Sequence, residues 1–526
     1  MSAEKIIAAM TEPAFYPDRP RAVEFRQTHI SRVFLAGDFV YKLKKPVRFA
    51  FLDYSTLHRR YHFCREEVRL NRRLTPRVYL GIYAILPHGG GFVLSADPAE
   101  QFDERAAEYV VKMRRLPDDR SLERLIGAGQ VTAAEMRRIA GVLAAFHAGA
   151  ARDRSMEYGR AEEIQRSVAT NLEECRPFVG DTIGEPEFGW IDRFYRSFIE
   201  RQRILLDRRA HQGMVRDGHG DLRCEHICLT ADIDIIDCVE FNESLRYADI
   251  ASDLGFLLMD LDRLQAPSLG HHLLSAYLEE IGDRDLSRLL NFYKCHRALV
   301  RGKVASLKAR DQDVPTEQRE RARKSARNYF AAAYRYARAG SPALIVVCGL
   351  PATGKSTVAQ ALAERSGFAV FNSDVVRKRM AGKAPTERAG GGWGEGIYSS
   401  GFTAATYQTL ADEAVQMLRG GDGVIVDATY KDRAERERLR NLARAAAVPI
   451  VFAECTLDDE QARHRLAARA LRPDAVSDAT WDTYLQHKAA FAPFAEDFAG
   501  CHLRLDGTAD AVANACAIER FIAVHA

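Results

Sequence analysis

A glycine-rich loop in the last third of the sequence has the residue types and spacing that bind polyphosphates. Residues 349–357 read GLPATGKST, a full match to the pattern G-x-x-x-x-G-K-[ST]. The loop follows the apolar run 343–348 and opens a helical stretch, which is the context that this pattern requires. In such a loop the backbone N–H groups hold the phosphates, Lys355 reaches the β- and γ-phosphates, and Ser356 ligates Mg²⁺. The residues predicted to bind nucleotide are Gly349, Pro351, Ala352, Thr353, Gly354, Lys355, Ser356 and Thr357.

Two aspartates follow later apolar runs and could complete a site for phosphoryl transfer. Asp374 comes after the run 369–371, where it could accept the proton of an attacking hydroxyl group or position Mg²⁺. Asp427 ends the run 423–427, the place of an aspartate that holds Mg²⁺ beside the loop. Other roles stay open, because Ser373 or Asp374 could cap a helix and Asp427 could be a cap or turn residue.

Arginines near these aspartates could bind anionic groups. Arg377 lies one helical turn after Asp374 and could grip an anion. Arg465, Arg469 and Arg472 are spaced i, i+4 and i+7 in a helical stretch, so they share one face of it. They could close over the transferred phosphoryl group, or they could form an exposed charged face.

A second set of acidic residues lies near the middle of the chain. The sequence H-G-D ends at Asp221, and Asp237 follows sixteen residues later, after two short strands expected at 227–229 and 233–237. A kinase needs one carboxylate to orient and deprotonate the acceptor hydroxyl group, and a second one, on a strand just beyond, to hold Mg²⁺ against the phosphates. Asp221 and Asp237 have this order, so we assign them these two roles.

The elements expected around these residues change character along the chain. The apolar runs 31–36 and 39–43 flank a Gly-Asp turn and predict a β-hairpin in a strand-rich first quarter. Helices are expected from about 104 to 209 and from about 248 to 339. From residue 343 onward strands alternate with helices, which predicts a parallel sheet flanked by helices.

Length and composition limit the classes of protein to which the chain can belong. Its 526 residues exceed what one hydrophobic core organises, so two or three domains are expected. With 47% hydrophobic and 28% charged residues, the composition is that of an ordinary globular protein. The net charge of +3 gives no case for a nucleic-acid partner. No apolar run reaches membrane-spanning length and the N-terminus lacks a signal-peptide layout, so we expect a cytoplasmic protein without a membrane partner.

The region from residue 343 to the C-terminus is similar to a known group of kinases. Its loop, combined with the S-D-x-x-R element at 373–377, resembles the small P-loop kinases related to zeta toxins, gluconate kinase and the kinase part of polynucleotide kinase. This resemblance implies ATP-dependent phosphoryl transfer to a hydroxyl group. It also implies a substrate-binding segment at 390–398, with Trp393 and Tyr398 as candidate contacts.

The earlier H-G-D-L sequence and the strand and acid after it resemble the aminoglycoside phosphotransferase and choline kinase family, which has the protein-kinase fold. The resemblance implies that Lys42 on an early strand binds the α- and β-phosphates. Glu67, on a helix expected over 55–74, would be its ion-pair partner. Lys44 and Glu66 are alternatives, because Lys42 and Lys44 point to the same side of a strand.

One position departs from this family. The family has a metal-binding asparagine five residues after the catalytic aspartate, where this chain has His226. A neutral imidazole can ligate a metal but suits hard Mg²⁺ poorly. Three alternatives follow: His226 contacts phosphate or metal, Asp237 and Glu240 carry the ion, or the site is impaired. In the same family the next helix borders the acceptor pocket, so Asp249 and Asp253 could bind a cationic substrate, although Asp249 also suits a helix cap.

The order of the two regions resembles a bacterial fusion of an aminoglycoside phosphotransferase-like half with a P-loop kinase half. We predict an α+β protein-kinase-like domain at 1–307, a helical connector at 308–342 and an α/β P-loop kinase domain at 343–526. The predicted function is ATP- and Mg²⁺-dependent transfer of the γ-phosphoryl group to hydroxyl groups of small molecules by two modules. The alternative is an N-terminal pseudokinase or nucleotide-sensing regulatory module, with catalysis only in the C-terminal kinase.

Overall fold

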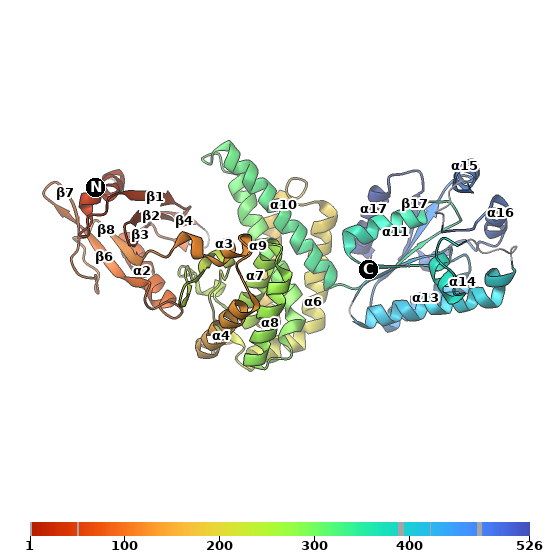
Figure 1. The fold of residues 1–526 in the computed structure, drawn as a ribbon, viewed down its shortest axis with the longest axis horizontal. Coiled ribbons are helices and arrows are strands. Elements are labelled where there is room, and N and C mark those ends of the chain that lie inside the picture. The colour runs from red at the N-terminus through yellow and green to blue at the C-terminus, as the bar shows by residue number, and fades with distance from the viewer. Residues whose placement is uncertain (1–2, 50–51, 388–393, 421, 471–475, 526) are drawn as a thin grey trace. The chain divides into compact units, whose positions relative to one another are not determined.

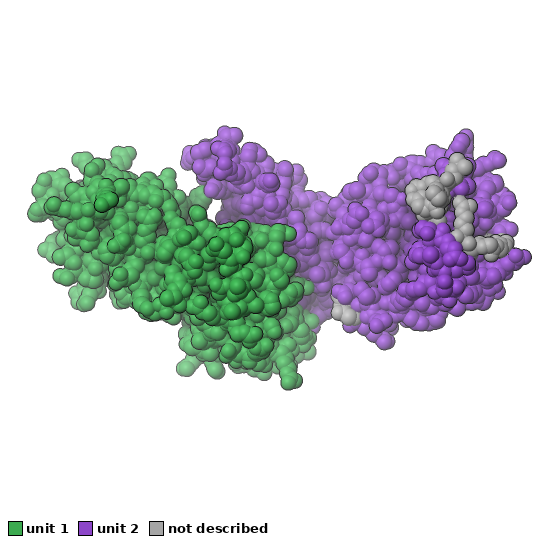
Figure 2. Space-filling view, viewed as in Figure 1, with its two compact units in different colours: residues 1–166, 202–297 green, residues 167–201, 298–526 purple. Residues whose placement is uncertain are grey.

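The computed structural model describes residues 3–49, 52–387, 394–420, 422–470 and 476–525. The chain forms two compact units, shown in two colours in Figure 2. Unit 1 contains residues 1–166 and 202–297, and unit 2 contains residues 167–201 and 298–526. Residues 308–342, the expected connector, therefore belong to unit 2 together with the region expected to be α/β. The predicted domain borders at 307 and 342 stay predictions.

Unit 1 contains an antiparallel sheet with the strand order β1-β2-β3-β8-β6-β7 (Figure 1). Its strands are β1 (Val23–Gln27), β2 (Ser31–Ala36), β3 (Phe39–Lys44), β6 (Tyr79–His88), β7 (Gly91–Leu94) and β8 (Glu108–Arg114). Strands β2 and β3 pair with Ala36 opposite Phe39, which confirms the predicted hairpin. Gly37 in this turn has a φ of +62°, a conformation that glycine adopts without strain.

Helix α2 (Leu57–Asn71) packs on this sheet against β6 and β8. The side chain of Thr56 caps it by accepting the Arg59 N–H. Glu67 belongs to its buried face, three residues after the buried Cys64, so the helix turns this carboxylate towards the sheet.

The region around the H-G-D sequence of unit 1 is built from two small antiparallel pairs. Strand β9 (Val215–Asp217) pairs with β12 (Tyr247–Asp249), and β10 (Ile227–Leu229) pairs with β11 (Ile233–Ile235). Asp221 lies between β9 and β10, and Asp237 follows β11. The β10–β11 hairpin thus returns the chain towards the H-G-D sequence. A further pair joins β4 (Arg48–Phe49) and β5 (Leu52–Asp53).

Helices make up most of the rest of unit 1. They are α1 (Ala3–Thr11), α3 (Leu122–Gly127), α4 (Ala133–Gly149), α7 (Ile250–Arg263) and α8 (Pro267–Ile281). Three helices include residues of both units: α5 (Ala161–Cys175), α6 (Glu185–His211) and α9 (Leu290–Arg310). Short 3₁₀ turns occur in unit 1 at Pro13–Phe15, Asp118–Arg120, Cys224–His226, Glu243–Leu245 and Leu286–Leu289.

Unit 2 contains the predicted parallel sheet, with the strand order β14-β15-β13-β16-β17. Its strands are β13 (Leu344–Cys348), β14 (Ala369–Asn372), β15 (Val424–Asp427), β16 (Ile450–Thr456) and β17 (His502–Asp506), all parallel to their neighbours. Every residue of β13 is buried, as expected for a central strand covered on both faces. The carboxyl ends of β13, β14 and β15 therefore meet at one edge, where ligands bind in sheets of this kind.

Helices connect and cover the strands of unit 2. They are α10 (Thr316–Ala339), α11 (Lys355–Ser366), α12 (Ser373–Met380), α13 (Ser400–Gly420), α14 (Arg433–Ala445), α15 (Asp459–Ala470), α16 (Trp481–Ala489) and α17 (Ala511–His525). The 3₁₀ turns here are Arg176–Phe178, Gly396–Tyr398 and Glu496–Phe498. Among the helices in the described part of the chain, none combines the length and apolar character needed to cross a membrane.

Candidate functional site

The glycine-rich loop joins β13 to α11 through residues with positive φ. Gly349 has a φ of +129° and Gly354 a φ of +95°. A Cβ atom on Gly349 would lie 2.3 Å from the Cys455 carbonyl oxygen, so this turn requires glycine. Lys355 Nζ donates a hydrogen bond to the Leu350 carbonyl oxygen at 2.8 Å. The ammonium group thus lies over the loop, in the position from which it can bind a phosphate.

The remaining predicted loop residues lie in the turn and at the start of α11. Since α11 begins at Lys355, Ser356 and Thr357 lie in its first turn, whose backbone N–H groups have no partners within the helix. Thr353 Oγ1 donates to the Leu350 carbonyl oxygen at 2.9 Å and stabilises the turn. The remaining turn residues are Pro351 and Ala352.

Asn372 connects the two predicted aspartates of unit 2. It lies opposite Asp427 in the pairing of β14 with β15, and its Nδ2 donates to Asp427 Oδ2 at 2.6 Å. Its Oδ1 accepts the N–H groups of Asp374 at 2.9 Å and Val375 at 3.1 Å, so Asn372 is the N-cap of α12. The alternative in which Ser373 or Asp374 caps this helix is therefore wrong.

Asp374, Lys355 and Asp427 lie in electrostatic range of one another. Burial raises the pKa of Asp374 above the usual range of an aspartate, against the opposing effects of a Ser477 hydrogen bond and the Arg377 charge. Burial lowers the pKa of Lys355, and the charge of Asp427 opposes this shift. Asp374 and Lys355 each respond to the other and to Asp427, so the fold brings these three predicted residues together.

The predicted arginines of α15 lie near the same region. Arg465 Nη1 donates to the Ala352 carbonyl oxygen at 3.3 Å, which places its side chain against the phosphate loop. Burial lowers the pKa of Arg469, and the negative charge of Asp374 opposes this shift. Arg472 lies outside the described residues.

Arg377 has a structural role in the described conformation. It is buried, and its Nη1 donates to the Ile397 carbonyl oxygen at 2.8 Å and to Thr403 Oγ1 at 2.9 Å. Its guanidinium carbon lies 5.1 Å from the centre of the Tyr398 ring. These contacts hold the end of the expected substrate segment, whereas Trp393 lies outside the described residues.

In unit 1, Lys42 and Lys44 share the carboxylate of Glu67. Lys42 Nζ lies 2.9 Å from Glu67 Oε1, and Lys44 Nζ lies 2.7 Å from Glu67 Oε2. The Lys44 side chain is 1% exposed and also pairs with Glu240, whereas the Lys42 side chain is 14% exposed and lies 2.8 Å from Asp237 Oδ1. Lys42 therefore connects Glu67 to the predicted metal-binding aspartate, and Lys44 lies deeper in the fold.

Glu66, the alternative partner of the lysines, faces another way. Its Oε2 pairs with Arg69 Nη2 at 2.6 Å on the surface of α2. Glu240 is held from a second side, because Tyr54 donates a hydrogen bond to its Oε1 at 2.5 Å. Lys44, Tyr54 and Glu240 thus form a buried polar cluster behind Lys42.

The H-G-D loop is held by a buried aspartate of α7. Asp253 accepts the N–H of His219 at 2.6 Å and of Gly220 at 2.9 Å. Burial lowers the pKa of His219 to about 4, so its imidazole is neutral, and its Nε2 donates to the Ile236 carbonyl oxygen at 3.0 Å. His219 thereby fixes the distance between the loop of Asp221 and the end of β11.

Asp221 and Asp237 lie on either side of His226. Arg223 donates from Nε to Asp221 Oδ1 at 3.1 Å and from Nη2 to Asp221 Oδ2 at 3.0 Å. The same Nη2 lies 3.1 Å from His226 Nε2, which lies 3.6 Å from Asp237 Oδ2. The ammonium group of Lys42 lowers the pKa of Asp237, although burial opposes the shift, so this carboxylate is ionised.

The donor atoms of this site fit a metal ion that arrives with a nucleotide. In the parts of the chain that the structure describes, no group of three or more His, Cys, Asp and Glu side chains could hold a metal ion by itself. Asp237 offers one oxygen ligand and His226 one nitrogen. Ions of nucleotide sites are held by one or two protein ligands together with phosphate oxygens, so a pair is sufficient.

The expectation that Asp249 and Asp253 bind a cationic substrate is corrected by their contacts. Asp249 is the N-cap of α7 through its hydrogen bond from the Ala251 N–H at 2.9 Å, as the capping alternative predicted. It also pairs with the buried Arg209 at 2.6 Å. Asp253 is 5% exposed and accepts the loop N–H groups. Both carboxylates are engaged inside unit 1.

Sequence comparison finds relatives that match most of this chain. The uncharacterized protein Rv2004c of Mycobacterium tuberculosis (strain ATCC 25618 / H37Rv) is 32% identical over 450 residues, which are 85% of this chain and 86% of the relative. The uncharacterized protein Mb2027c of Mycobacterium bovis (strain ATCC BAA-935 / AF2122/97) matches to the same extent. The chain belongs to the family of these mycobacterial proteins.

Besides this family, residues 344–493 match a family model described as an AAA domain. The matched region contains Lys355, Asp374, Asp427 and α15. Among solved structures, a gluconokinase from Sinorhizobium meliloti 1021 is 17% identical with a TM-score of 0.26, covering 35% of this chain and 94% of that chain. A choline/ethanolamine kinase family protein from Mesorhizobium loti is 14% identical with a TM-score of 0.35, covering 63% of this chain and 99% of that chain.

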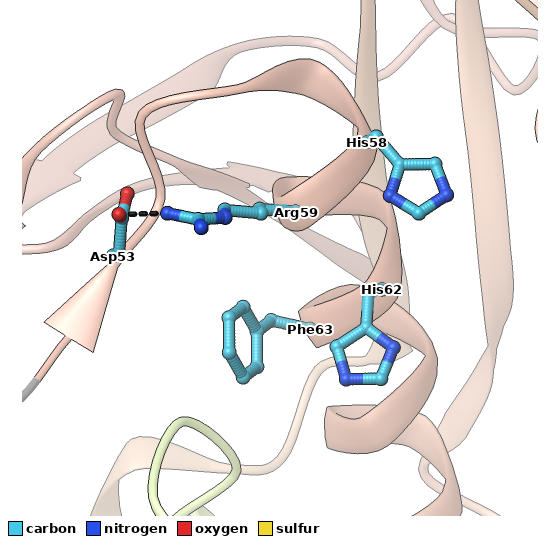
Figure 3. Close-up of a pocket in the computed structure, with 5 residues that line it drawn as sticks. All are labelled: Asp53, His58, Arg59, His62 and Phe63. Carbon is cyan, nitrogen blue, oxygen red and sulfur yellow. Dashed lines mark hydrogen bonds and ion pairs between the residues drawn. The ribbon is translucent and has the colours of Figure 1, made fainter.

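A separate pocket of about 430 Å³ lies on the outer face of α2 (Figure 3). The residues that line it are Asp53, His58, Arg59, His62 and Phe63. Arg59 points across the pocket to pair with Asp53. Glu67, the partner of Lys42 and Lys44, belongs to the buried face of the same helix. The pocket is therefore not part of the site that contains these two lysines.

Three residues of the two sites were not predicted from the sequence. Asn372 could have been found, because asparagine directly before a helix is a frequent cap. Arg223 gave no signal beyond its position two residues after Asp221. His487 on α16 gave none, yet burial and the positive charges of Lys431 and Lys355 lower its pKa to about 3. Only the fold brings this histidine into electrostatic range of Lys355.

Proposed function

We propose that the chain is an ATP-dependent phosphotransferase with two kinase modules, each of which transfers the γ-phosphoryl group to a hydroxyl group of a small molecule. The nucleotide of unit 2 binds at the loop 349–357, and that of unit 1 binds beside Lys42. Parallel-sheet topology, the AAA-domain match and the positions of the acidic residues support this proposal.

In unit 2 the side chains divide the work of phosphoryl transfer. Lys355 binds the β- and γ-phosphates, while Ser356 and Asp427 are the side chains that would hold Mg²⁺, which neutralises charge on the phosphates when bound. Asp374 accepts the proton as the acceptor oxygen bonds to the γ-phosphorus and the bond to the β–γ bridging oxygen breaks. Arg465 and Arg469 stabilise the charge on the transferred group.

In unit 1 the corresponding roles fall to residues of β3, of α2 and of the segment 221–237. Lys42, held by Glu67, binds the α- and β-phosphates. Asp237 and His226 are the side chains that would hold the metal ion. Asp221 accepts the proton of the acceptor hydroxyl group, which requires Arg223 to release at least one of its oxygens.

The observation that carries the proposal is the position of Asp374. A carboxylate that is half-buried, has a raised pKa and lies in electrostatic range of Lys355 and Asp427 is suited to act as a general base. A nucleotide-binding loop used only for sensing needs no such group.

The proposal is tested by incubating the full-length protein with ATP, Mg²⁺ and a metabolite extract, and identifying new phosphorylated species by mass spectrometry. Asp374→Asn is expected to reduce the products of unit 2 by about 100-fold or more, and Asp221→Asn those of unit 1. The exposed Asp412→Asn and Asp232→Asn are matched controls. If neither active-site change lowers any product, the proposal is wrong.

The pseudokinase alternative for unit 1 is favoured by one contact. Arg223 occupies both carboxylate oxygens of Asp221, which leaves the predicted base engaged. In a Lys355→Ala protein, this alternative predicts nucleotide binding without transfer in a single turnover. Phosphorylated product from that variant, lost on adding Asp221→Asn, would contradict it.

A further inference from the structure

The imidazole of His226 is held in one tautomer. Its Nδ1 lies 2.9 Å from the Asp221 carbonyl oxygen, and its Nε2 lies 3.1 Å from Arg223 Nη2. A guanidinium group can only donate, so Nε2 must be the acceptor and the proton must be on Nδ1. The backbone carbonyl oxygen thus fixes Nδ1–H and leaves the Nε2 lone pair for a ligand, the arrangement found in metal-binding histidines.

The Nε2 lone pair is close to the one carboxylate that a nucleotide metal ion needs. His226 Nε2 and Asp237 Oδ2 are 3.6 Å apart, a separation that a single ion can bridge at usual bond lengths of roughly 2.0–2.3 Å. Lys42 engages the other oxygen, Oδ1, at 2.8 Å. Asp237 has a φ of +64°, so its backbone is held in an uncommon conformation that aims this carboxylate.

The two donors differ in the ions that they prefer. A carboxylate suits Mg²⁺ and Mn²⁺ alike, whereas an imidazole nitrogen binds Mn²⁺, a transition-metal ion, more readily than it binds the harder Mg²⁺. At the position of His226, Mg²⁺ would be bound by a nitrogen atom instead of the oxygen atom that it prefers. Mn²⁺ accepts nitrogen and oxygen ligands and still binds phosphate oxygens.

We infer that the nucleotide site of unit 1 selects Mn²⁺ over Mg²⁺, with His226 Nε2 and Asp237 Oδ2 as the protein ligands of the ion. The inference rests on the proposed nucleotide binding by unit 1. It assigns His226 a role in choosing the metal rather than treating it as damage to the site.

Arg223 gives this selection a second component. Its guanidinium group donates to Nε2, so an ion must displace a positive charge from the same atom. The bond between the imidazole nitrogen and Mn²⁺ offsets the loss of the Arg223 hydrogen bond. The weaker bond between this nitrogen and Mg²⁺ does not. The displaced guanidinium still has Glu225 as a partner, because the structure pairs the two side chains.

The test uses the full chain with Lys355→Ala, which weakens the nucleotide site of unit 2. Protein labelled with ¹⁵N-histidine is loaded with Mn²⁺ and ADP, and pulsed electron paramagnetic resonance records nitrogen nuclei bound to Mn²⁺. The Lys355→Ala protein, which keeps His226, is expected to give a ¹⁵N signal from a coordinated imidazole. It should disappear in His226→Asn and remain in His487→Asn, the matched control for the histidine near the other loop.

A second measurement compares ADP affinity in Mn²⁺ and in Mg²⁺ in the same background. His226→Asn is expected to lower the preference for Mn²⁺ by about tenfold, because asparagine offers oxygen in place of nitrogen. His226→Gln serves the same purpose if the asparagine variant does not fold.

The outcomes separate the inference from the proposed function. ADP bound with Mn²⁺ but no ¹⁵N signal, or a metal preference that His226→Asn leaves unchanged, overturns the inference alone. A Lys355→Ala protein that binds no nucleotide with either ion overturns the proposed role of unit 1 and the inference with it.

Discussion

Glu67 is the residue that joins the two lysines of unit 1, Lys42 and Lys44. Its two carboxylate oxygens contact two ammonium groups, Lys42 at 2.9 Å and Lys44 at 2.7 Å, and the Glu67 side chain is itself only 1% exposed. Removing one member of a buried ion pair leaves a buried charge without compensation, which is costly.

Glu67→Gln is therefore expected to lower the free energy of unfolding of unit 1 by about 3 kcal/mol or more. Glu66→Gln is the matched control, because its pairing with Arg69 is at the surface and such pairs contribute at most about 1 kcal/mol. Urea unfolding of both variants measures the difference. An equal decrease in the free energy of unfolding for both variants would contradict the stabilising role assigned to Glu67.

His219 gives unit 1 a defined pH dependence. Burial lowers its pKa to about 4 from about 6.5, so below pH 6.5 the unfolded chain binds the proton more readily than the folded one. The contribution of the neutral His219 imidazole to the free energy of unfolding is therefore fully present above about pH 6.5 and is lost as the pH falls towards 4. At pH 5 this loss amounts to about 2 kcal/mol.

His219→Asn is expected to remove about 2 kcal/mol of the stability change between pH 7 and pH 5. Urea unfolding at pH 7 and pH 5 gives the free energy of unfolding at each pH. The difference between the two values is then compared between the variants. The exposed His88→Asn should keep the full pH dependence. A His219 variant with an unchanged difference contradicts the assignment of a buried neutral imidazole.

At the scale of elements, the phosphate loop depends on how tightly β13 passes β16. The Cβ atom of an alanine at 349 would lie 2.3 Å from the Cys455 carbonyl oxygen, and backbone atoms there cannot move without disturbing the sheet. Gly367, which ends α11, also has a positive φ but has open space around it.

Gly349→Ala should therefore abolish nucleotide binding by unit 2 and destabilise it by more than about 2 kcal/mol. Gly367→Ala should cost about 1 kcal/mol of strain and leave binding unchanged. Binding of a fluorescent ADP analogue in an Asp221→Asn, Lys42→Ala background would measure the loop of unit 2. Normal affinity in Gly349→Ala would contradict this account.

Elements with a strong local pattern could be predicted from the sequence. The 31–36 and 39–43 hairpin, the strand before the loop and the parallel sheet of unit 2 all appear, because alternation, turn residues and apolar runs are local signals. The grouping of residues 167–201 with unit 2 could not be predicted, since it depends on packing between helices that are distant in the chain.

At the scale of the whole molecule, each of the two units has its own buried polar network. In unit 2 the fully buried Glu519 of α17 pairs with Arg338 of α10 at 3.0 Å and with Arg365 of α11 at 2.7 Å, and accepts a hydrogen bond from Tyr334 at 2.6 Å. The network therefore ties the helix that starts at the phosphate loop to α10, which lies outside the α/β region expected from the sequence.

Glu519→Gln is expected to destabilise unit 2 by about 3 kcal/mol and to leave unit 1 unchanged. Hydrogen exchange followed by mass spectrometry should show faster exchange in α10, α11 and α17, with no change in β3 and α2. Glu364→Gln, an exposed change on α11, is the control. Faster exchange in β3 and α2 as well would contradict the prediction that the loss is confined to unit 2.

The sequence by itself determined the phosphate loop, the order of Asp221 and Asp237, and the presence of His226 where an asparagine was expected, because each is a short pattern along the chain. Only the tertiary structure decided which acids pair with Lys42, that Arg223 holds Asp221, and that His487 lies in electrostatic range of Lys355. Lys42 and Lys44 lie on one side of a strand, so local geometry cannot choose between them. Their partners at Glu67, Asp237 and Glu240 come from distant segments, and that choice exists only once the chain has folded.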